Sequence, residues 1–304
     1  MFPETTAAPR GILFDLDGTL IDSQQDIATA VNRMRAERDL PPLTVAQVGA
    51  MVGEGARVLV RRALPPGSGK EEMRGALASY LAHYAEVCLD TTRAYPGIGA
   101  MLATLAPSYS LGVLTNKGED LARRILAGLG LDRHLREVVG GDTLPTRKPN
   151  PGGVFLLADR FAIPAERLLL VGDSDIDART AGAAGCAFAL ALWGAPASAG
   201  EGGREAAADG DDADAEDAAV DGEEAAAGGG DGAAAGESTA AGESTAAGGA
   251  GGSASPAGGA GGAGAAGDEA ASGGRASGPA APLWRCARPR DLPAALGLTL
   301  DVED

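Results

Sequence analysis

Short apolar runs alternate with helical stretches along most of the chain. The strand-like runs lie near residues 11–13, 109–114, 137–139, 167–171 and 186–192. Helical patterns lie near residues 119–129, 151–161 and 175–184. Strands that alternate with helices of this length are typical of βαβ units, whose strands form a parallel sheet covered by helices. The pattern therefore predicts an α/β fold with a doubly wound, Rossmann-like parallel sheet.

Between residues 22 and 94 the pattern is helical throughout. Ile27, Val31 and Met34 recur at spacings of four and three residues, which places them on one face of a helix. Two more helical stretches follow, at 54–64 and 71–89. We predict a separate all-helical unit, residues 22–94, inserted after the first strand.

The composition changes sharply between residues 195 and 281. This segment holds 24 of the 47 glycines and, proline aside, Val220 is its only aliphatic side chain larger than alanine. It has 16 acidic residues against 2 arginines, so −14 of the chain's net charge of −17 lies here. Such a segment cannot bury enough apolar surface to offset the entropy lost on ordering. We therefore predict a long disordered acidic insertion.

Apolar sequence resumes after this insertion. Residues 283–287 form a strand-like run, and Pro289 and Gly297 flank the next stretch as proline and glycine flank helices. We expect both elements to return to the sheet, so that residues 1–21, 95–194 and 282–304 form one core domain. If the strands on either side of the insertion belong to one sheet, a short bridge should be able to replace it.

Charge and hydropathy exclude several classes of partner. The acidic balance argues against nucleic acid, and no apolar run approaches the length of a membrane span. Residues 1–10 lack the apolar core of a signal peptide. The three cysteines are an odd number without metal-like spacing, which fits a reducing compartment. We expect a cytoplasmic monomer or homodimer.

Two acids follow the first strand and indicate a site. Asp15 and Asp17 stand directly after the apolar run, and Gly18 permits the turn that comes next. Two carboxylates held together repel each other unless a cation or a shared proton stabilises them. A hard divalent cation with oxygen ligands is the favoured solution. The alternative is an ordinary polar turn between a strand and a helix.

Three later segments carry further polar groups. They are, in order, Thr115-Asn116-Lys117 after the run at 109–114, Lys148 in a basic turn, and Asp173 with Asp177 after the run at 167–171. The carboxyl ends of parallel strands open on one edge of a sheet, and ligands bind there. The four segments can therefore converge on one point.

In this order the four segments resemble the motifs of the haloacid-dehalogenase-like hydrolases. The resemblance covers roughly residues 10–193 and 283–298. A second set of segments looks like those of one group in that superfamily, the bacterial phosphoglycolate phosphatases. These segments are residues 51–56, 95–97, 114–117 and 139–149. Sugar-phosphate phosphatases share many of them. The resemblance also implies that residues 22–94 form a cap over the active site.

The resemblance implies a Mg²⁺-dependent phosphatase that acts on a small phosphorylated metabolite. Asp15 would be the nucleophile that forms an aspartyl phosphate, and Asp17 the general acid and then the general base. Mg²⁺ would be held by the carboxylates of Asp15 and Asp173 and the backbone carbonyl of Asp17. Thr115 and Lys148 would bind the transferring phosphoryl group, and Lys148 would also pair with Asp15.

Three more residues are expected at the site, two of them with alternative roles. Gly18 is expected beside the substrate phosphate. Asn116 would contact phosphate or cap the next helix. Asp177, one turn after Asp173, would orient metal-bound water or Lys148, or interact with the helix dipole.

Substrate choice would come from the cap. Gly55 precedes a helix whose N–H groups could face a substrate carboxylate, and Arg62 could add a cation or be an ordinary surface arginine. Glu54 places a negative charge nearby, which disfavours an anionic substrate.

The leading interpretation is hydrolysis of 2-phosphoglycolate. The nearest alternative is the same chemistry on a sugar phosphate or amino-sugar phosphate, followed by a phosphomutase and by a non-catalytic binding protein. A dehalogenase is disfavoured, because it needs no proton donor two residues after its nucleophile and Asp17 stands there.

Overall fold

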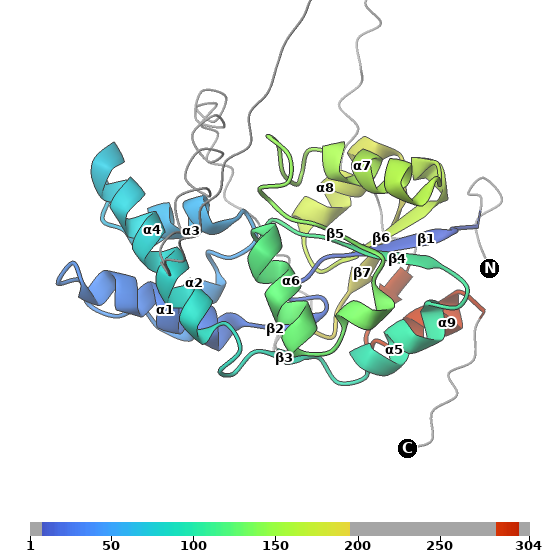
Figure 1. Ribbon diagram of the computed structural model, residues 1–304, viewed down its shortest axis with the longest axis horizontal. Coiled ribbons are helices and arrows are strands. Elements are labelled where there is room, and N and C mark those ends of the chain that lie inside the picture. Colours follow the sequence, from blue (N-terminus) through green and yellow to red (C-terminus); the bar gives the residue numbers. More distant parts are fainter. Residues whose placement is uncertain (1–7, 195–283, 298–304) are drawn as a thin grey trace, which may run out of the picture. The chain divides into compact units, whose positions relative to one another are not determined.

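The computed structural model describes residues 8–194 and 284–297, all within one compact unit. Within these ranges, parallel strands form one sheet in the order β5-β4-β1-β6-β7-β8 (Figure 1). They are β1 (Gly11–Phe14), β4 (Ser110–Leu114), β5 (Glu137–Val139), β6 (Leu168–Gly172), β7 (Ala187–Ala191) and β8 (Trp284–Cys286). The predicted parallel α/β sheet is confirmed.

Each face of the sheet has its own apolar cluster. Ile12 and Phe14 of β1 belong to one cluster, and Leu13 between them belongs to the other, as the alternation of strand side chains requires. The first face is covered by α5 (Ile98–Leu105), α6 (Glu119–Gly128) and α9 (Asp291–Ala295), the second by α7 (Gly152–Phe161) and α8 (Asp175–Ala184) (Figure 1). Burial on both faces explains the continuous apolar runs.

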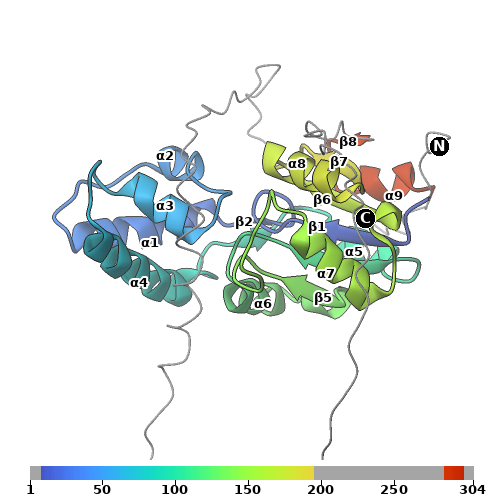
Figure 2. The same ribbon diagram turned by 90° about the horizontal axis from the view of Figure 1, so that it is seen from above.

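The predicted cap contains four helices, which pack together in Figure 2. They are α1 (Gln24–Ala36), α2 (Val45–Gly49), α3 (Ala56–Ala63) and α4 (Lys70–Val87). Ile27, Val31 and Met34 of α1 are buried, as their spacing predicts. The sequence did not predict α2, because five residues are too few to show a helical period. The domain limits at 22 and 94 stay a prediction.

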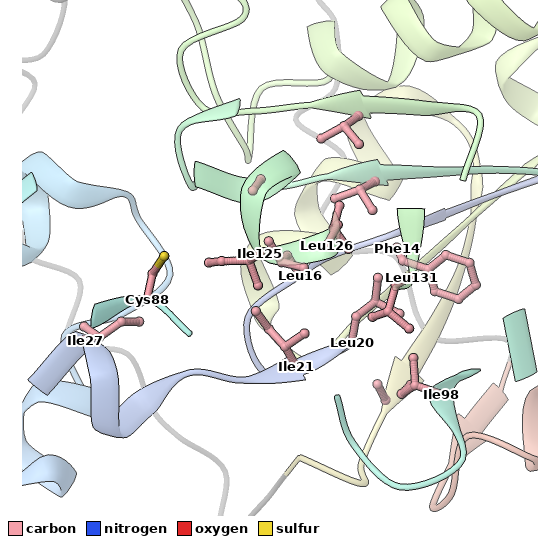
Figure 3. Close-up of a cluster of buried hydrophobic side chains, with 14 of the residues drawn as sticks. Phe14, Leu16, Leu20, Ile21, Ile27, Cys88, Ile98, Ile125, Leu126 and Leu131 are labelled. Carbon is pink, nitrogen blue, oxygen red and sulfur yellow. The ribbon is translucent and has the colours of Figure 1, made fainter. Parts of the chain in front are cut away.

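Both passages between the cap and the sheet run side by side. Strands β2 (Ile21–Asp22) and β3 (Arg93–Ala94) pair in antiparallel fashion. Just beyond them, the carboxylate of Asp26 accepts hydrogen bonds from the backbone N–H and hydroxyl groups of Thr91 and Thr92, at 2.5–3.1 Å. Figure 3 shows buried apolar side chains continuing through this passage, from Ile21 to Ile27.

The chain returns to the sheet after the acidic segment, as predicted. Strand β8 pairs with β7 in parallel, with Ala189 opposite Trp284. A parallel pair needs a crossover of about a dozen residues or more, so this pairing sets the minimum length of a bridge, and the expectation that a short one suffices stays a prediction. The predicted disordered insertion at 195–281 lies outside the described residues. None of the helices in the described part is long and apolar enough to cross a membrane.

Candidate active site

Three neighbouring strands end at the candidate site. β1 lies between β4 and β6, and the residues that directly follow these strands are Asp15, Thr115 and Asp173. The backbone N–H of Asp15 still bonds to Val171 O of β6, at 2.9 Å, so the strand delivers this carboxyl group to the sheet edge. The convergence that the sequence predicts is therefore present in the fold.

Lys148 lies at the centre of a buried ion-pair group. Its Nζ atom is 2.8 Å from Asp15 Oδ1 and 2.7 Å from Asp177 Oδ1. Burial lowers the pKa of Lys148, but the two carboxylates outweigh burial and raise it above its ordinary value. The lysine therefore remains a cation at neutral pH, and it holds Asp15 in a fixed place.

Asp177 has both of its oxygens engaged. Oδ1 receives the bond from Lys148, and Oδ2 receives bonds from the hydroxyl and the N–H of Ser174 in the capping box of α8. The side chain is fully buried. Several roles for Asp177 were open at the sequence level. This geometry fits the role in which Asp177 orients Lys148, and it also places Asp177 in the first turn of α8.

The carboxyl groups of Asp15, Asp173 and Asp177 are crowded. Their oxygen atoms lie within 4.8 Å of one another. Burial, followed by repulsion from Asp15 and Asp177, raises the pKa of Asp173 to about 7, and burial raises the pKa of Asp15 to about 6 against the opposing effect of Lys148. Because Asp177 is already satisfied, Asp15 and Asp173 are the oxygen donors left for a hard divalent cation, and such a donor set fits Mg²⁺.

Gly18 allows Asp173 to approach the turn that carries Asp17. Gly18 has a φ of +83°, and a Cβ atom there would lie only 2.4 Å from Asp173 Oδ2. A larger residue would therefore be strained in its backbone and would displace this carboxylate. The direct role of Gly18 is thus to bring the two acidic segments together, and its expected contact with phosphate stays a prediction.

Asp17 is held by two donors that act on the same oxygen. Ser23 Oγ donates to Asp17 Oδ1 at 2.5 Å, and Lys117 Nζ donates to the same atom at 2.8 Å. Lys117 also donates to the hydroxyl of Tyr84, on α4 of the predicted cap, at 2.6 Å. Ser23, Lys117 and Tyr84 had no predicted role at the sequence level.

Thr115 and Asn116 follow β4 but have different environments. Thr115 is buried, and its hydroxyl accepts a bond from the N–H of Lys117 at 3.2 Å. Asn116 binds the Lys148 backbone with both ends of its amide, at 2.9 and 3.0 Å, and its Nδ2 also donates to Gly53 O at 2.9 Å.

Asn116 does not cap the next helix, because α6 begins after Gly118 without a side-chain cap. Its amide instead fixes the segment that carries Lys148, and it ties that segment to a turn of the predicted cap. Its expected contact with phosphate stays a prediction.

Gly55 and Arg62 lie in different settings. Gly55 has a φ of +91°, and a Cβ atom there would lie 2.9 Å from Arg147 Nη1 and 3.2 Å from Asn116 O. The turn before α3 therefore contacts the loops that carry the site. Arg62 Nη2 pairs with Glu54 Oε1 at 2.5 Å, and both side chains are more than two-fifths exposed. This pair offsets the negative charge of Glu54, which had disfavoured an anionic substrate.

Comparisons with known proteins agree with this geometry. Residues 12–191 match the family described as haloacid dehalogenase-like hydrolase. The chain is 44% identical over 194 residues to a phosphoglycolate phosphatase of Rhodospirillum rubrum, covering 61% of this chain and 80% of that protein. It is 40% identical to phosphoglycolate phosphatase 1 of Pseudomonas aeruginosa, covering 62% and 71% of the two chains.

A solved structure of a similar protein has the same fold. The crystal structure of a predicted phosphoglycolate phosphatase from Haemophilus somnus superposes with a TM-score of 0.58 at 32% identity, covering 60% of this chain and 85% of that one. The match to the family extends over more than half of the chain, from β1 to β7, and it includes all the strand ends that form the site. The chain is an enzyme, and it belongs to the haloacid dehalogenase-like hydrolase family.

Proposed function

We propose that this hydrolase is a Mg²⁺-dependent phosphatase, that it forms an aspartyl phosphate, and that its substrate is 2-phosphoglycolate. The observation that carries the proposal is the arrangement at the ends of β1, β4 and β6. There a buried Lys148 joins Asp15, and Asp173 crowds the same point. A nucleophile, a cation that neutralises charge and a second acid are the groups that hydrolysis of a phosphate monoester requires.

Asp15 is proposed as the nucleophile. Its carboxylate attacks phosphorus, and the phosphorus–oxygen bond to the leaving group breaks, so that one difficult reaction becomes two easier displacements. Lys148 fixes Asp15 at 2.8 Å and would offset the negative charge of the phosphoryl oxygens. Thr115 is buried just after β4, the strand that pairs with β1, and it would donate its hydroxyl to one of these oxygens.

Asp17 is proposed as the general acid and then the general base. Its Oδ1 already accepts bonds from Ser23 and Lys117, and Oδ2 is the oxygen that would carry the proton. That proton passes to the leaving oxygen in the first step, and the resulting carboxylate removes a proton from water in the second.

Mg²⁺ would be held by the carboxylates of Asp15 and Asp173 and the backbone carbonyl of Asp17. When bound, the ion would neutralise charge between the attacking carboxylate and the anionic phosphate. It would also offset the burial and the repulsion from Asp15 and Asp177 that together raise the pKa of Asp173.

The choice of 2-phosphoglycolate rests on two observations. The relatives from Rhodospirillum rubrum and Pseudomonas aeruginosa carry that substrate in their names. In addition, the turn at Gly53–Gly55 reaches the loops of the site, and Arg62 offsets the charge of Glu54 beside it. A substrate carboxylate would therefore meet the N-terminus of α3 without a net repulsive charge.

A phosphate-release assay tests the proposal. Purified protein is given 2-phosphoglycolate, hexose 6-phosphates and amino-sugar 6-phosphates, each with Mg²⁺ and with excess EDTA. We expect release that depends on Mg²⁺ and a kcat/KM for 2-phosphoglycolate at least about tenfold above the others. The Asp15→Asn variant, prepared identically, measures any contaminating phosphatase. A preference for a sugar phosphate would overturn the substrate, and release that persists in Asp15→Asn would overturn the mechanism.

A further inference from the structure

A buried lysine connects the proposed general acid to the predicted cap. Lys117 lies just after β4, and its side chain is 6% exposed. Its Nζ atom donates to Asp17 Oδ1 at 2.8 Å and to the hydroxyl oxygen of Tyr84 at 2.6 Å. Tyr84 belongs to α4, so one ammonium group joins the end of a sheet strand, the acid and a cap helix.

Tyr84 is itself fixed in place. It is 1% exposed, and its ring stacks on Tyr80 one helical turn earlier, with ring centroids 5.8 Å apart and an angle of 8° between the planes. Lys117 Nζ lies 4.6 Å from the centre of the Tyr84 ring. A rigid aromatic pair therefore positions the hydroxyl that receives the bond from Lys117.

The charge states of these groups are settled by their surroundings. Burial lowers the pKa of Lys117, but the carboxylate of Asp17 outweighs burial and raises it above its ordinary value. Burial raises the pKa of Tyr84 to about 12. At neutral pH, Lys117 is therefore an ammonium ion and Tyr84 a neutral phenol, so the bonds between them and Asp17 persist.

The same geometry distinguishes the two oxygens of Asp17. Oδ1 accepts from both Lys117 and Ser23. The carboxyl group is thereby held in one orientation, and Oδ2 is the oxygen left to carry the proton in the acid step. When that proton passes to the leaving oxygen as the phosphorus–oxygen bond breaks, the negative charge left on Asp17 meets an ammonium group already in contact.

We propose that Lys117 is a positioning residue for the proton-donating carboxyl of Asp17, and that Tyr84 makes this positioning depend on the docking of α4. The inference rests on the proposed phosphatase chemistry but not on 2-phosphoglycolate as the substrate. The leaving group of any alkyl phosphate is an alkoxide, and an alkoxide needs a proton. Its consequence is that full acid catalysis requires α4 in place.

The test compares two leaving groups. Variants Tyr84→Phe and Lys117→Met are assayed on p-nitrophenyl phosphate, whose leaving group needs no proton, and on the alkyl phosphate that the wild type hydrolyses best. We read kcat/KM, because it covers the steps up to departure of the leaving group. We expect about a tenfold loss for Tyr84→Phe and about a hundredfold loss for Lys117→Met on the alkyl phosphate, against less than about threefold on p-nitrophenyl phosphate.

Tyr80→Phe is the matched control, because it removes a hydroxyl group from the stacked neighbour and leaves the Lys117–Tyr84 bond in place. Its kcat/KM should match the wild type on both substrates. Thermal melting of each variant separates a folding defect from a chemical one, and Tyr84→Phe serves if Lys117→Met does not fold.

Equal losses on the two substrates would overturn the positioning role. A selective loss in Lys117→Met with none in Tyr84→Phe would overturn the link to α4. A wild type that hydrolyses no phosphate ester would overturn the proposed function, and this inference with it.

Discussion

Replacing Asp173 with asparagine should stabilise the metal-free protein at alkaline pH. Asp173 lies in a crowded acidic cluster, and burial with repulsion from Asp15 and Asp177 raises its pKa from 3.8 to about 7. The unfolded chain therefore releases this proton at a lower pH than the folded protein does. It follows that the stability contributed by Asp173 is full below about pH 4 and is lost as the pH rises to about 7.

The size of the effect follows from that pKa. Between pH 5 and pH 8 the folded carboxyl resists ionisation over about two pH units, and each unit corresponds to about 1.4 kcal/mol. The stability that Asp173 can cost the folded protein between these pH values is therefore at most about 3 kcal/mol. Solvent reaches this partly buried group, so we expect about 1–2 kcal/mol. For a domain of this size, that corresponds to a melting temperature about 2–8 °C higher for Asp173→Asn at pH 8 in EDTA.

The assay is thermal unfolding in EDTA at pH 5 and pH 8, followed by the addition of Mg²⁺. The advantage of Asp173→Asn over the wild type should grow between the two pH values. Mg²⁺ should then raise the melting temperature of the wild type but not that of the variant. The control is Asp175→Asn, which removes a nearby carboxylate that is 62% exposed and paired with Arg179. If wild type and Asp173→Asn respond equally to pH and to Mg²⁺, the crowded-cluster explanation is wrong.

Three further predictions concern other parts of the molecule. Asp26→Asn should destabilise the protein by about 1–3 kcal/mol in urea unfolding, because the carboxylate accepts bonds from both Thr91 and Thr92. Burial raises the pKa of Asp26, but these bonds outweigh it and lower the pKa, so the difference should shrink as the pH falls below about 4; a constant difference would argue against the bonds. Arg62→Ala should lower stability by less than about 1 kcal/mol, since its pair with Glu54 is exposed, and should raise KM for 2-phosphoglycolate with kcat unchanged; an unchanged KM would remove Arg62 from the substrate site. Residues 195–281, which lie outside the described residues, can be replaced by a Gly-Ser linker. Because β7 and β8 are parallel, their connection needs about a dozen residues, of which 192–194 and 282–283 already supply five. Activity should therefore persist only when the linker has about seven residues or more; full activity and an unchanged melting temperature with a linker of about two residues would contradict that topology.

The sheet and its site edge could be predicted because both depend on local pattern. Apolar runs mark the strands, and in a parallel sheet the residues after them must share an edge, which brings Asp15, Thr115 and Asp173 together. The short or uniformly apolar elements could not be predicted in this way. Helix α5 is apolar at most positions, so it shows no clear helical period, and β2 and β3 have two residues each.

The partners of the site residues could not be predicted, because they depend on contacts between distant segments. Asn116 was expected to contact phosphate or to cap a helix, but its amide bonds to the backbone of Lys148, 32 residues away. Lys117 reaches Asp17 across 100 residues and Tyr84 across 33. No spacing in the sequence encodes such contacts, although a lysine directly after Thr115 and Asn116 was a signal that it lies near the site.

The central claim is that Asp15 becomes phosphorylated during turnover, and trapping of that intermediate tests it most directly. The enzyme is mixed with 2-phosphoglycolate and Mg²⁺, quenched in acid within one turnover and digested for peptide mass mapping. We predict a phosphoryl group on the peptide that contains Asp15, sensitive to hydroxylamine as an acyl phosphate is, and absent when EDTA replaces Mg²⁺. Release of phosphate with no labelled peptide, or with the label on another residue, would contradict the account.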